Sequence, residues 1–314
     1  MSQLLRRKII PALLAGLVFS SAPIFSQTEP TEGPLPTTAL ITVQSKNGTP
    51  LDPSMLKLQI NRHEAPITSV TPVTPAAAQV AILIDDGLRF TFSSQLGDFT
   101  DFINQLPAGT KVMVGYMQDG TVRAAHGFSA DHAAAAAALR IPMSSAGISA
   151  SPYFCLSEFV KDWPARGPGA RFVLMITNGV DPYNGRPSIM NQDSPYVQTA
   201  QEDAERAGVA VYSIYYGDVG FPGGRGSFSG QSYLQQVAEA TGGDSFYQGT
   251  ITPPSLAPYL KQFSKAIAES YTVSFTVNSK GTKRDTLTQI KLTSHQPGVK
   301  IHAPQGVHPG LNLQ

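Results

Sequence analysis

Two adjacent carboxylates, Asp85 and Asp86, follow a continuous apolar run, Val80 to Ile84, and are the best placed for chemistry in this sequence. Such a run is typical of a central strand that is buried on both faces. Asn178 comes directly after a second run of this kind, Phe172 to Thr177. In open parallel sheets ligands bind beyond the carboxyl ends of the strands, so we expect these side chains to share one edge. The other candidate residues at this edge are Gly87, Arg89, Ser149, Ser151 and Asp181.

Catalytic motifs are not found in the sequence. No Gly-x-Ser-x-Gly elbow occurs, and the six histidines lack the close spacing of metal sites, so we interpret them as surface or turn residues. The glycine-rich segment 217–230 lacks the Gly-Lys-Ser/Thr ending of a phosphate-binding loop and is interpreted as a mobile loop at the same edge. The single cysteine, Cys155, is interpreted as a small buried hydrophobe.

From Gln79 onward, strand-like runs alternate with amphipathic helical segments. This order predicts an α/β fold with a doubly wound, mostly parallel, Rossmann-like sheet that is covered by helices on both faces. Gln118-Asp119-Gly120 predicts a tight turn, which makes the next strand antiparallel. The predicted strands are 80–84, 111–117, 121–126, 172–177, 209–216 and 245–247; the predicted helices are 96–106, 129–139, 153–163, 195–207, 233–240 and 256–268.

Short alternating segments flank this α/β region on both sides. The runs 39–44 and 56–61 precede it, and 271–277, 286–292 and 299–302 follow it. Neither set has enough strands to be stable alone, so we expect one small β module made from both chain ends. The predicted organisation is a signal peptide (1–26), a flexible leader (27–38), N-terminal strands (39–75), the main domain (79–269), C-terminal strands (270–304) and a tail (305–314).

The first 26 residues have the pattern of a secretory signal. Three basic residues, Arg6 to Lys8, precede an apolar stretch, Ile9 to Phe19, that at about eleven residues is too short to span a bilayer. We expect cleavage near Ser26 and a periplasmic or secreted protein without a transmembrane segment. Without those three basic residues, 20 basic residues face 22 acidic ones, and the formal net charge changes from +1 to −2. A nearly neutral chain argues against nucleic-acid binding and against a polybasic membrane anchor.

Three segments give the sequence a family resemblance: AILIDDGLRF, VLMITNGVDP and VAVYSIYYGD. They resemble the ends of the first and fourth strands, and the fifth strand, of a von Willebrand factor type A domain. The flanking segments that begin ALITVQSKNG and ESYTVSFTVN are similar, more narrowly, to exported A-domain-related proteins of acidobacteria. The resemblance covers nearly all of residues 38–304. It implies the same α/β fold and a role in protein recognition.

In metal-binding members of this family, a D-x-S-x-S loop, a Thr and a second Asp hold a divalent cation through hard oxygen ligands. Asp85 matches the first Asp, but Gly87 and Arg89 replace the two Ser residues, and Asn178 replaces the second Asp. Either Ser149 or Ser151 stands in for the Thr. The resemblance therefore implies a degenerate metal-ion-dependent adhesion site.

The guanidinium of Arg89 would oppose a cation at this position. Two unit charges about 4 Å apart interact by roughly 4 kcal/mol at an effective dielectric of 20. We therefore expect no conventional metal, and Mg²⁺ held by Asp85 and Asn178 remains the alternative. Two interpretations of Arg89 stay open: it pairs with Asp85 or Asp86 and grips an acidic side chain of a partner, or it points to solvent without a role.

These observations predict an exported, non-enzymatic protein-binding module for adhesion or assembly of an envelope complex. The carboxyl edge of the sheet would bind the partner, without a cofactor. Two alternatives use the same edge: a metal-dependent hydrolase or transferase, and a periplasmic small-molecule binder.

Overall fold

The structure is a computed structural model that describes residues 33–45, 48–185, 190–217, 225–249, 252–278 and 286–314. The predicted signal peptide and the first half of the leader, 27–32, therefore lie outside the described residues. So does the middle of the glycine-rich segment, 218–224. Among the residues that the structure describes, no helix is long and apolar enough to cross a membrane.

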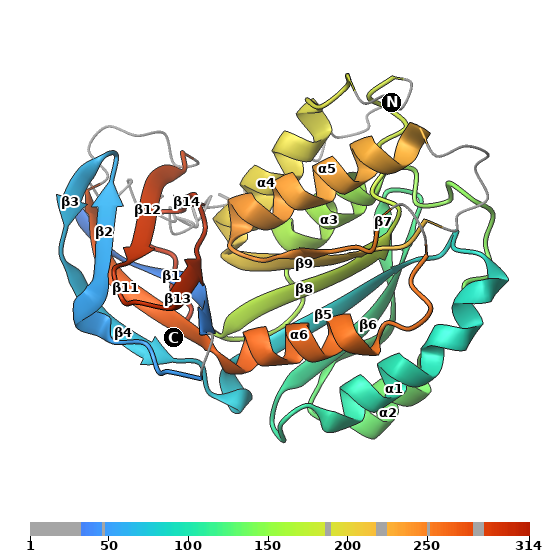
Figure 1. Cartoon of the computed structure of the whole chain (residues 1–314), viewed down its shortest axis with the longest axis horizontal. Helices are drawn as coiled ribbons and strands as arrows, with labels where there is room; N and C mark the ends of the chain where they lie inside the picture. The colour runs from blue at the N-terminus through green and yellow to red at the C-terminus, as the bar shows by residue number, and fades with distance from the viewer. Residues whose placement is uncertain (1–32, 46–47, 186–189, 218–224, 250–251, 279–285) are drawn as a thin grey trace, which may run out of the picture. The chain divides into compact units, whose positions relative to one another are not determined.

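A six-stranded sheet forms the centre of the α/β region, in the order β10-β9-β8-β5-β6-β7. Neighbouring strands are parallel except for the edge strand β7, which is antiparallel to β6. This arrangement confirms the predicted doubly wound, mostly parallel sheet (Figure 1). The strands are β5 (Ala78–Asp85), β6 (Lys111–Gln118), β7 (Thr121–Ser129), β8 (Ala170–Thr177), β9 (Val209–Tyr215) and β10 (Ser245–Phe246).

The predicted turn between β6 and β7 is also present. Asp119 and Gly120 both have positive φ, 48° and 73°. Positive φ at both central residues matches the right-handed twist of the flanking strands, and it is the reason for the Asp-Gly sequence at this turn. The sequence therefore makes β7 antiparallel by local turn chemistry.

Helices cover both faces of this sheet (Figure 1). Alternate residues of β5 enter different cores, since side chains of a strand point to opposite faces. Ala81 and Leu83 pack with α3, α4 and α5, whereas Ile82 and Ile84 pack with α1, α2 and α6. The helices are α1 (Leu96–Gln105), α2 (His132–Ala137), α3 (Pro152–Lys161), α4 (Pro195–Ala207), α5 (Arg225–Thr241) and α6 (Ala257–Ala268).

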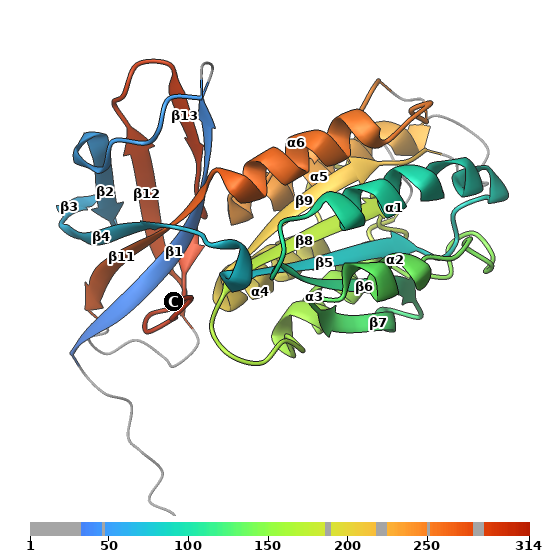
Figure 2. The same cartoon turned by 90° about the horizontal axis from the view of Figure 1, so that it is seen from below.

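The remaining strands form two four-stranded antiparallel sheets around a shared apolar core. One sheet has the order β13-β1-β11-β4, and the other β14-β12-β2-β3. In the first sheet, strands from before and after the α/β region alternate, and β1 lies beside β11 in Figures 1 and 2. In the second sheet, the two parts of the chain meet where β12 pairs with β2. The strands are β1 (Pro34–Ser45), β2 (Leu56–Ile60), β3 (His63–Ala65), β4 (Ile67–Pro72), β11 (Ser270–Asn278), β12 (Thr288–Ser294), β13 (Val299–His302) and β14 (Gly306–Val307).

Several predicted boundaries are wrong. Residues 34–38 of the predicted leader belong to β1, because Thr37 and Thr38 are buried by pairing with β11. The predicted tail 305–314 contains β14, and its Leu313 is 1% exposed in the apolar core. Helix α5 begins at Arg225 and so includes part of the predicted glycine-rich loop. His302 was expected in a turn or at the surface, but it lies half-buried in β13.

Candidate functional site

Asp85 is the last residue of β5, is 4% exposed, and joins three segments at the carboxyl edge of the sheet. Its Oδ1 accepts a hydrogen bond from the backbone N–H of Gly87 at 3.0 Å. Its Oδ2 accepts from the hydroxyls of Thr177, at 3.0 Å, and Ser149, at 3.2 Å. Burial raises the pKa of Asp85, and these hydrogen bonds oppose the rise. Asp85 therefore acts as an internal acceptor that holds the edge loops together.

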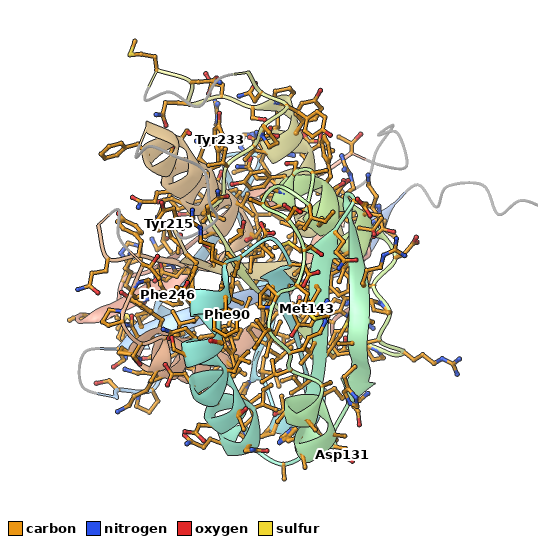
Figure 3. All side chains as sticks on the ribbon, turned by 90° about the vertical axis from the view of Figure 1, so that its right-hand side faces the viewer. Phe90, Asp131, Met143, Tyr215, Tyr233 and Phe246 are labelled. Atoms are coloured by element: carbon orange, nitrogen blue, oxygen red, sulfur yellow. The ribbon has the colours of Figure 1, made fainter. Side chains whose placement is uncertain are left out.

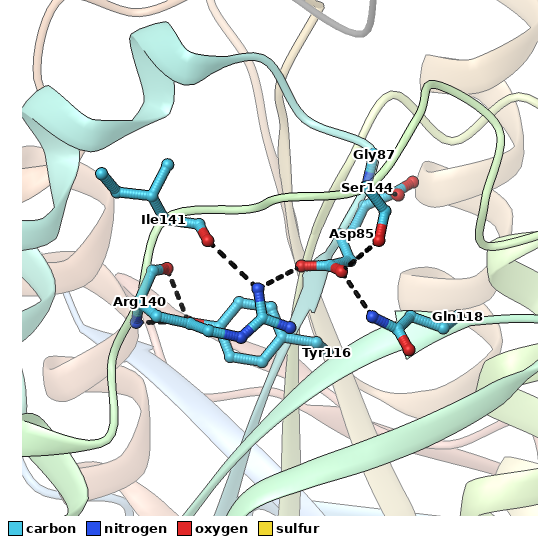
Figure 4. Close-up of polar contacts among 8 residues, drawn as sticks. Asp85, Gly87, Tyr116, Gln118, Arg140, Ile141 and Ser144 are labelled. Carbon is cyan, nitrogen blue, oxygen red and sulfur yellow. Dashed lines mark hydrogen bonds and ion pairs between the residues drawn. The ribbon is translucent and has the colours of Figure 1, made fainter.

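Asp86 is 1% exposed, and its charge is balanced by an arginine from another loop. Arg140 Nη1 lies 2.6 Å from Asp86 Oδ1. Ser144 donates to Oδ2 at 2.6 Å, and the amide of Gln118 donates to the same oxygen (Figure 4). Burial alone would raise the pKa of Asp86, but these hydrogen bonds together hold it below its usual range.

The guanidinium of Arg140 is itself fixed in place. Its central carbon lies 3.8 Å from the centroid of the Tyr116 ring, a cation–π contact. The hydroxyl of Tyr116 lies 2.7 Å from the backbone oxygen of Arg140, and the backbone N–H of Arg140 donates to the same hydroxyl. The cation that faces Asp86 is therefore part of the chain and is held by an aromatic ring (Figure 4).

The loop 141–151 closes over these two aspartates through backbone hydrogen bonds. The N–H of Ser144 donates to the carbonyl of Asp86 at 3.1 Å. The N–H groups of Asp119 and Gly120 donate to the carbonyls of Ile148 and Ser149, at 2.7 and 3.1 Å. The β6–β7 turn therefore anchors the loop at one end, and the end of β5 anchors it at the other.

Gly87 occupies the first of the two positions at which the family resemblance implies a hydroxyl ligand. A Cβ at Gly87 would lie 2.9 Å from the carbonyl oxygen of Ser145 and 3.2 Å from the backbone nitrogen of Gly147. Real Cβ atoms essentially never approach another heavy atom within 3.0 Å, as the contact with Ser145 would require. The backbone of the covering loop therefore fills the space that a serine side chain would need.

This arrangement does not fit a divalent cation. The Asp85 oxygens already accept three hydrogen bonds, and the Asp86 carboxylate is paired with a guanidinium. Asn178 Oδ1 accepts from the backbone N–H of Val180 at 3.0 Å. Among the described residues, no group of three or more His, Cys, Asp or Glu side chains could hold a metal ion. Divalent cations need several free oxygen ligands, and the described side chains of this edge named above do not offer them.

The structure separates the other predicted residues by their contacts. Ser149 contacts Asp85, whereas Ser151 caps α3 by accepting from the N–H of Tyr153. Asp181 is 3% exposed and accepts from Ser194 and from the backbone of Tyr183. Both Ser151 and Asp181 therefore hold local structure and are not accessible to a partner.

Arg89 is exposed at the start of a short 3-10 helix, Phe90–Gln95. The guanidinium that pairs with Asp86 comes instead from Arg140. Arg140, Tyr116 and Gln118 were missed because no local motif links them to residues 85 and 86. Only the sheet order, which places β6 beside β5, brings them together.

No protein-family model matches this sequence, and no curated protein matches it. Among solved structures, the conserved hypothetical protein BatB of Bacteroides thetaiotaomicron aligns over 60% of this chain and 97% of its own, with 14% identity and a TM-score of 0.43. A von Willebrand factor type A protein of Catenulispora acidiphila aligns over 86% and 72%, with 11% identity and a TM-score of 0.43. Proximal thread matrix protein 1 from the mussel byssus, with a zinc-occupied MIDAS motif, aligns over 66% and 50%, with 15% identity and a TM-score of 0.42.

These alignments are too weak to support a statement about function. The six-stranded order with its single antiparallel edge strand decides the fold. The α/β region has a doubly wound, Rossmann-like fold. Cys155 lies within it as predicted, fully buried in α3, and burial raises the pKa of its thiol far above the usual range.

Large apolar side chains are exposed on the carboxyl edge of the six-stranded sheet. The described residues include eight exposed large apolar side chains, and seven of them lie on loops or helix starts at this edge. Only Met55 lies elsewhere, among the antiparallel strands. We call these seven the apolar edge: Phe90, Met143, Tyr183, Met190, Tyr196, Phe228 and Tyr247.

Proposed function

We propose that this protein is an exported, non-enzymatic protein-binding module that uses the apolar edge without a divalent metal. Its biological role would be adhesion or assembly of an envelope complex. The apolar edge is the observation that carries the proposal. The signal-like pattern of residues 1–26 supports export.

The large side chains of the apolar edge have high exposed fractions. Met190, Met143 and Phe90 are 87%, 78% and 74% exposed, and Tyr183 is 57% exposed. Contiguous exposed apolar side chains mark interaction sites on proteins. Aromatic residues and Met are also enriched at protein interfaces, where charged residues are depleted. Figure 3 faces this edge, and Phe90 and Met143 are labelled near the middle of the view.

Part of the apolar edge is held rigidly by its own packing. The ring of Phe154 lies 5.0 Å from the rings of both Tyr183 and Tyr196, measured between centroids, and the two tyrosine rings lie 6.4 Å apart. Aromatic side chains that are already fixed lose little conformational entropy when a partner binds. Tyr183 and Tyr196 are therefore suited to anchor a partner.

The contacts beneath the apolar edge support the proposed independence from metal. Arg140 already supplies the positive charge that faces Asp86, and Gly87 leaves no room for a hydroxyl ligand. Arg89, exposed beside Phe90, would add a cation for an acidic side chain of the partner within a mainly apolar contact.

The test is capture of partners from the native envelope by the purified mature protein, with and without chelator. The double variant Phe90→Asp and Met143→Asp should reduce capture at least tenfold, because two charges would then enter an apolar contact. Met55→Asp is the matched control, since Met55 is an exposed methionine away from this edge. Chelator should leave capture by the wild type unchanged. Loss of capture with chelator, or an equal loss in the Met55 variant, would exclude the proposal.

A further inference from the structure

A second feature lies at the opposite, amino edge of the main sheet. A hollow of about 640 Å³ is present where α3 and α4 end and β8 begins. Its lining contains three cationic side chains and two carboxylates, an excess of one positive charge. The lining residues are Val160, Lys161, Asp162, Trp163, Arg171, Asp203, Arg206 and Ala207.

Two of the three cations share one carboxylate. Lys161 Nζ lies 2.9 Å from Asp203 Oδ2, and Arg206 Nη1 lies 2.8 Å from Asp203 Oδ1. Arg206 also pairs with Glu202 at 3.0 Å. Both basic residues lie in the last turns of their helices, where positive charge is favoured by the helix dipole. The positive charges of Lys161 and Arg206 are therefore balanced by carboxylates of the fold.

Arg171, the second residue of β8, has no such partner. Its Nη1 donates to the carbonyl of Ala207 at 2.8 Å, but no carboxylate of a described residue pairs with it. Its Nε is buried and has no hydrogen-bond partner among the described residues. Three arginines of the described chain are half-buried, and the other two, Arg140 and Arg206, both form ion pairs.

An unpaired charge that is partly removed from water is unfavourable. Burial accordingly lowers the pKa of Arg171. Within the described part of the chain, its guanidinium also contacts the ring of Trp163, whose centroid lies 5.7 Å away. Trp163 is itself fixed by a 2.7 Å hydrogen bond from its indole nitrogen to Gln79. A bound anion would supply the negative charge that the guanidinium of Arg171 lacks among the described residues.

We propose that Arg171 is the centre of a binding site for a small oxyanion, a carboxylate or a phosphate, in this hollow. A guanidinium binds such groups through charge-assisted hydrogen bonds. Lys161, whose side chain is 55% exposed, lines the same hollow and supplies a second positive charge at its border. This site is separate from the apolar edge, and its test does not depend on the proposed protein partner.

The test uses the natural fluorescence of the protein. Trp163 is the single tryptophan of the chain, so its emission reports on the surroundings of Arg171. The full chain is titrated with inorganic phosphate and, separately, with acetate, each against sodium chloride at matched ionic strength. Saturable changes in emission with phosphate or acetate, absent with chloride, are expected, and the arm that responds identifies the chemistry of the anion.

Arg171→Met should weaken the apparent affinity at least tenfold, and Arg166→Met, at an exposed position nearby, should leave it unchanged. Arg171→Lys keeps the charge but loses the planar donor geometry, so it should bind more weakly than wild type; it also serves if the methionine variant does not fold. If neither anion changes the emission beyond chloride, or if the response is unchanged in both Arg171 variants, Arg171 is only a cap for the end of α4.

Discussion

The two edges of the central sheet differ in whether a buried charge has an oppositely charged partner within the fold. At the carboxyl edge, Asp86 is matched by Arg140, and seven large apolar side chains are exposed above them. At the amino edge, no carboxylate of a described residue forms an ion pair with Arg171. The side chains that line the hollow beside it have an excess of one positive charge. A buried charge that is matched within the fold leaves the surface above it available for apolar contacts. An unmatched charge instead favours a charged ligand.

Breaking the Arg140–Asp86 pair should destabilise the protein strongly. Arg140→Met would leave the Asp86 charge buried without its cation, and removal of one partner of a buried pair costs about 3 to 5 kcal/mol. We expect a decrease near the lower value in the free energy of unfolding at pH 7, because the Arg140 side chain is 33% exposed. Urea denaturation measures it.

The matched control for this prediction is Arg89→Met, at an exposed position of the same edge. Its free energy of unfolding should change by less than about 0.5 kcal/mol, as expected for surface substitutions. Equal losses in the two variants would mean that Arg140 has no special part in balancing Asp86, and the contrast between the edges would fail.

Two single carboxylates at opposite edges, Glu205 and Asp86, should respond to pH in opposite directions. Glu205, near the end of α4, is 8% exposed, and burial raises its pKa to about 7. A raised folded pKa gives stability that is present at low pH and is lost as the pH rises toward the folded value. The free energy of unfolding should therefore fall by up to about 3 kcal/mol between pH 4.5 and 8 because of this group.

Glu205→Gln should remove this decrease, because the amide does not ionise. Urea denaturation across the same pH range, with the exposed Glu158→Gln as control, measures the difference. Asp86 acts in the other direction: its lowered pKa gives stability above the unfolded pKa that is lost as the pH falls. A Glu205→Gln protein with the same pH slope as wild type would contradict the assignment.

A smaller loss of stability is expected when a side chain is added at Gly87, beneath the loop 141–151. Gly87→Ser restores the family hydroxyl but forces its Cβ against the carbonyl of Ser145, so we expect a loss of about 2 kcal/mol. Gly97→Ser is the control, because nothing lies within 4 Å of a Cβ there. Thermal unfolding and a Mn²⁺ titration are measured for both. A Gly87→Ser protein of wild-type stability that binds Mn²⁺ would show that the loop opens readily.

Much of the fold could be predicted because the signals were local. The apolar run of β5 and the Asp119-Gly120 turn each specify their structure within a few residues. By contrast, β14 has only two residues, Gly306 and Val307, and pairs with Thr288 and Gln289 of β12. A strand that short has no periodicity of its own, so the sequence pattern could not distinguish it from a tail.

The candidate site was predicted in part. Asp85 and Ser149 do lie together, since both follow from the strand order. The partner of Asp86 was not found, because Arg140 is 54 residues away in sequence and no motif connects the two. The sequence also showed Gly87 only as a missing hydroxyl. The loop that contains Ser145 and Gly147 fills the space beside Gly87, and this can be seen only from the backbone geometry.

The pairing of β1 with β11 has a consequence during synthesis. Pro34 lies opposite Asn278, so a ribosome that adds about 5 to 20 residues per second needs on the order of tens of seconds to deliver the partner strand. Throughout that interval the twelve residues of β1, with their apolar side chains, cannot complete their ladder. The nascent polypeptide must therefore be kept from aggregating until its second half emerges.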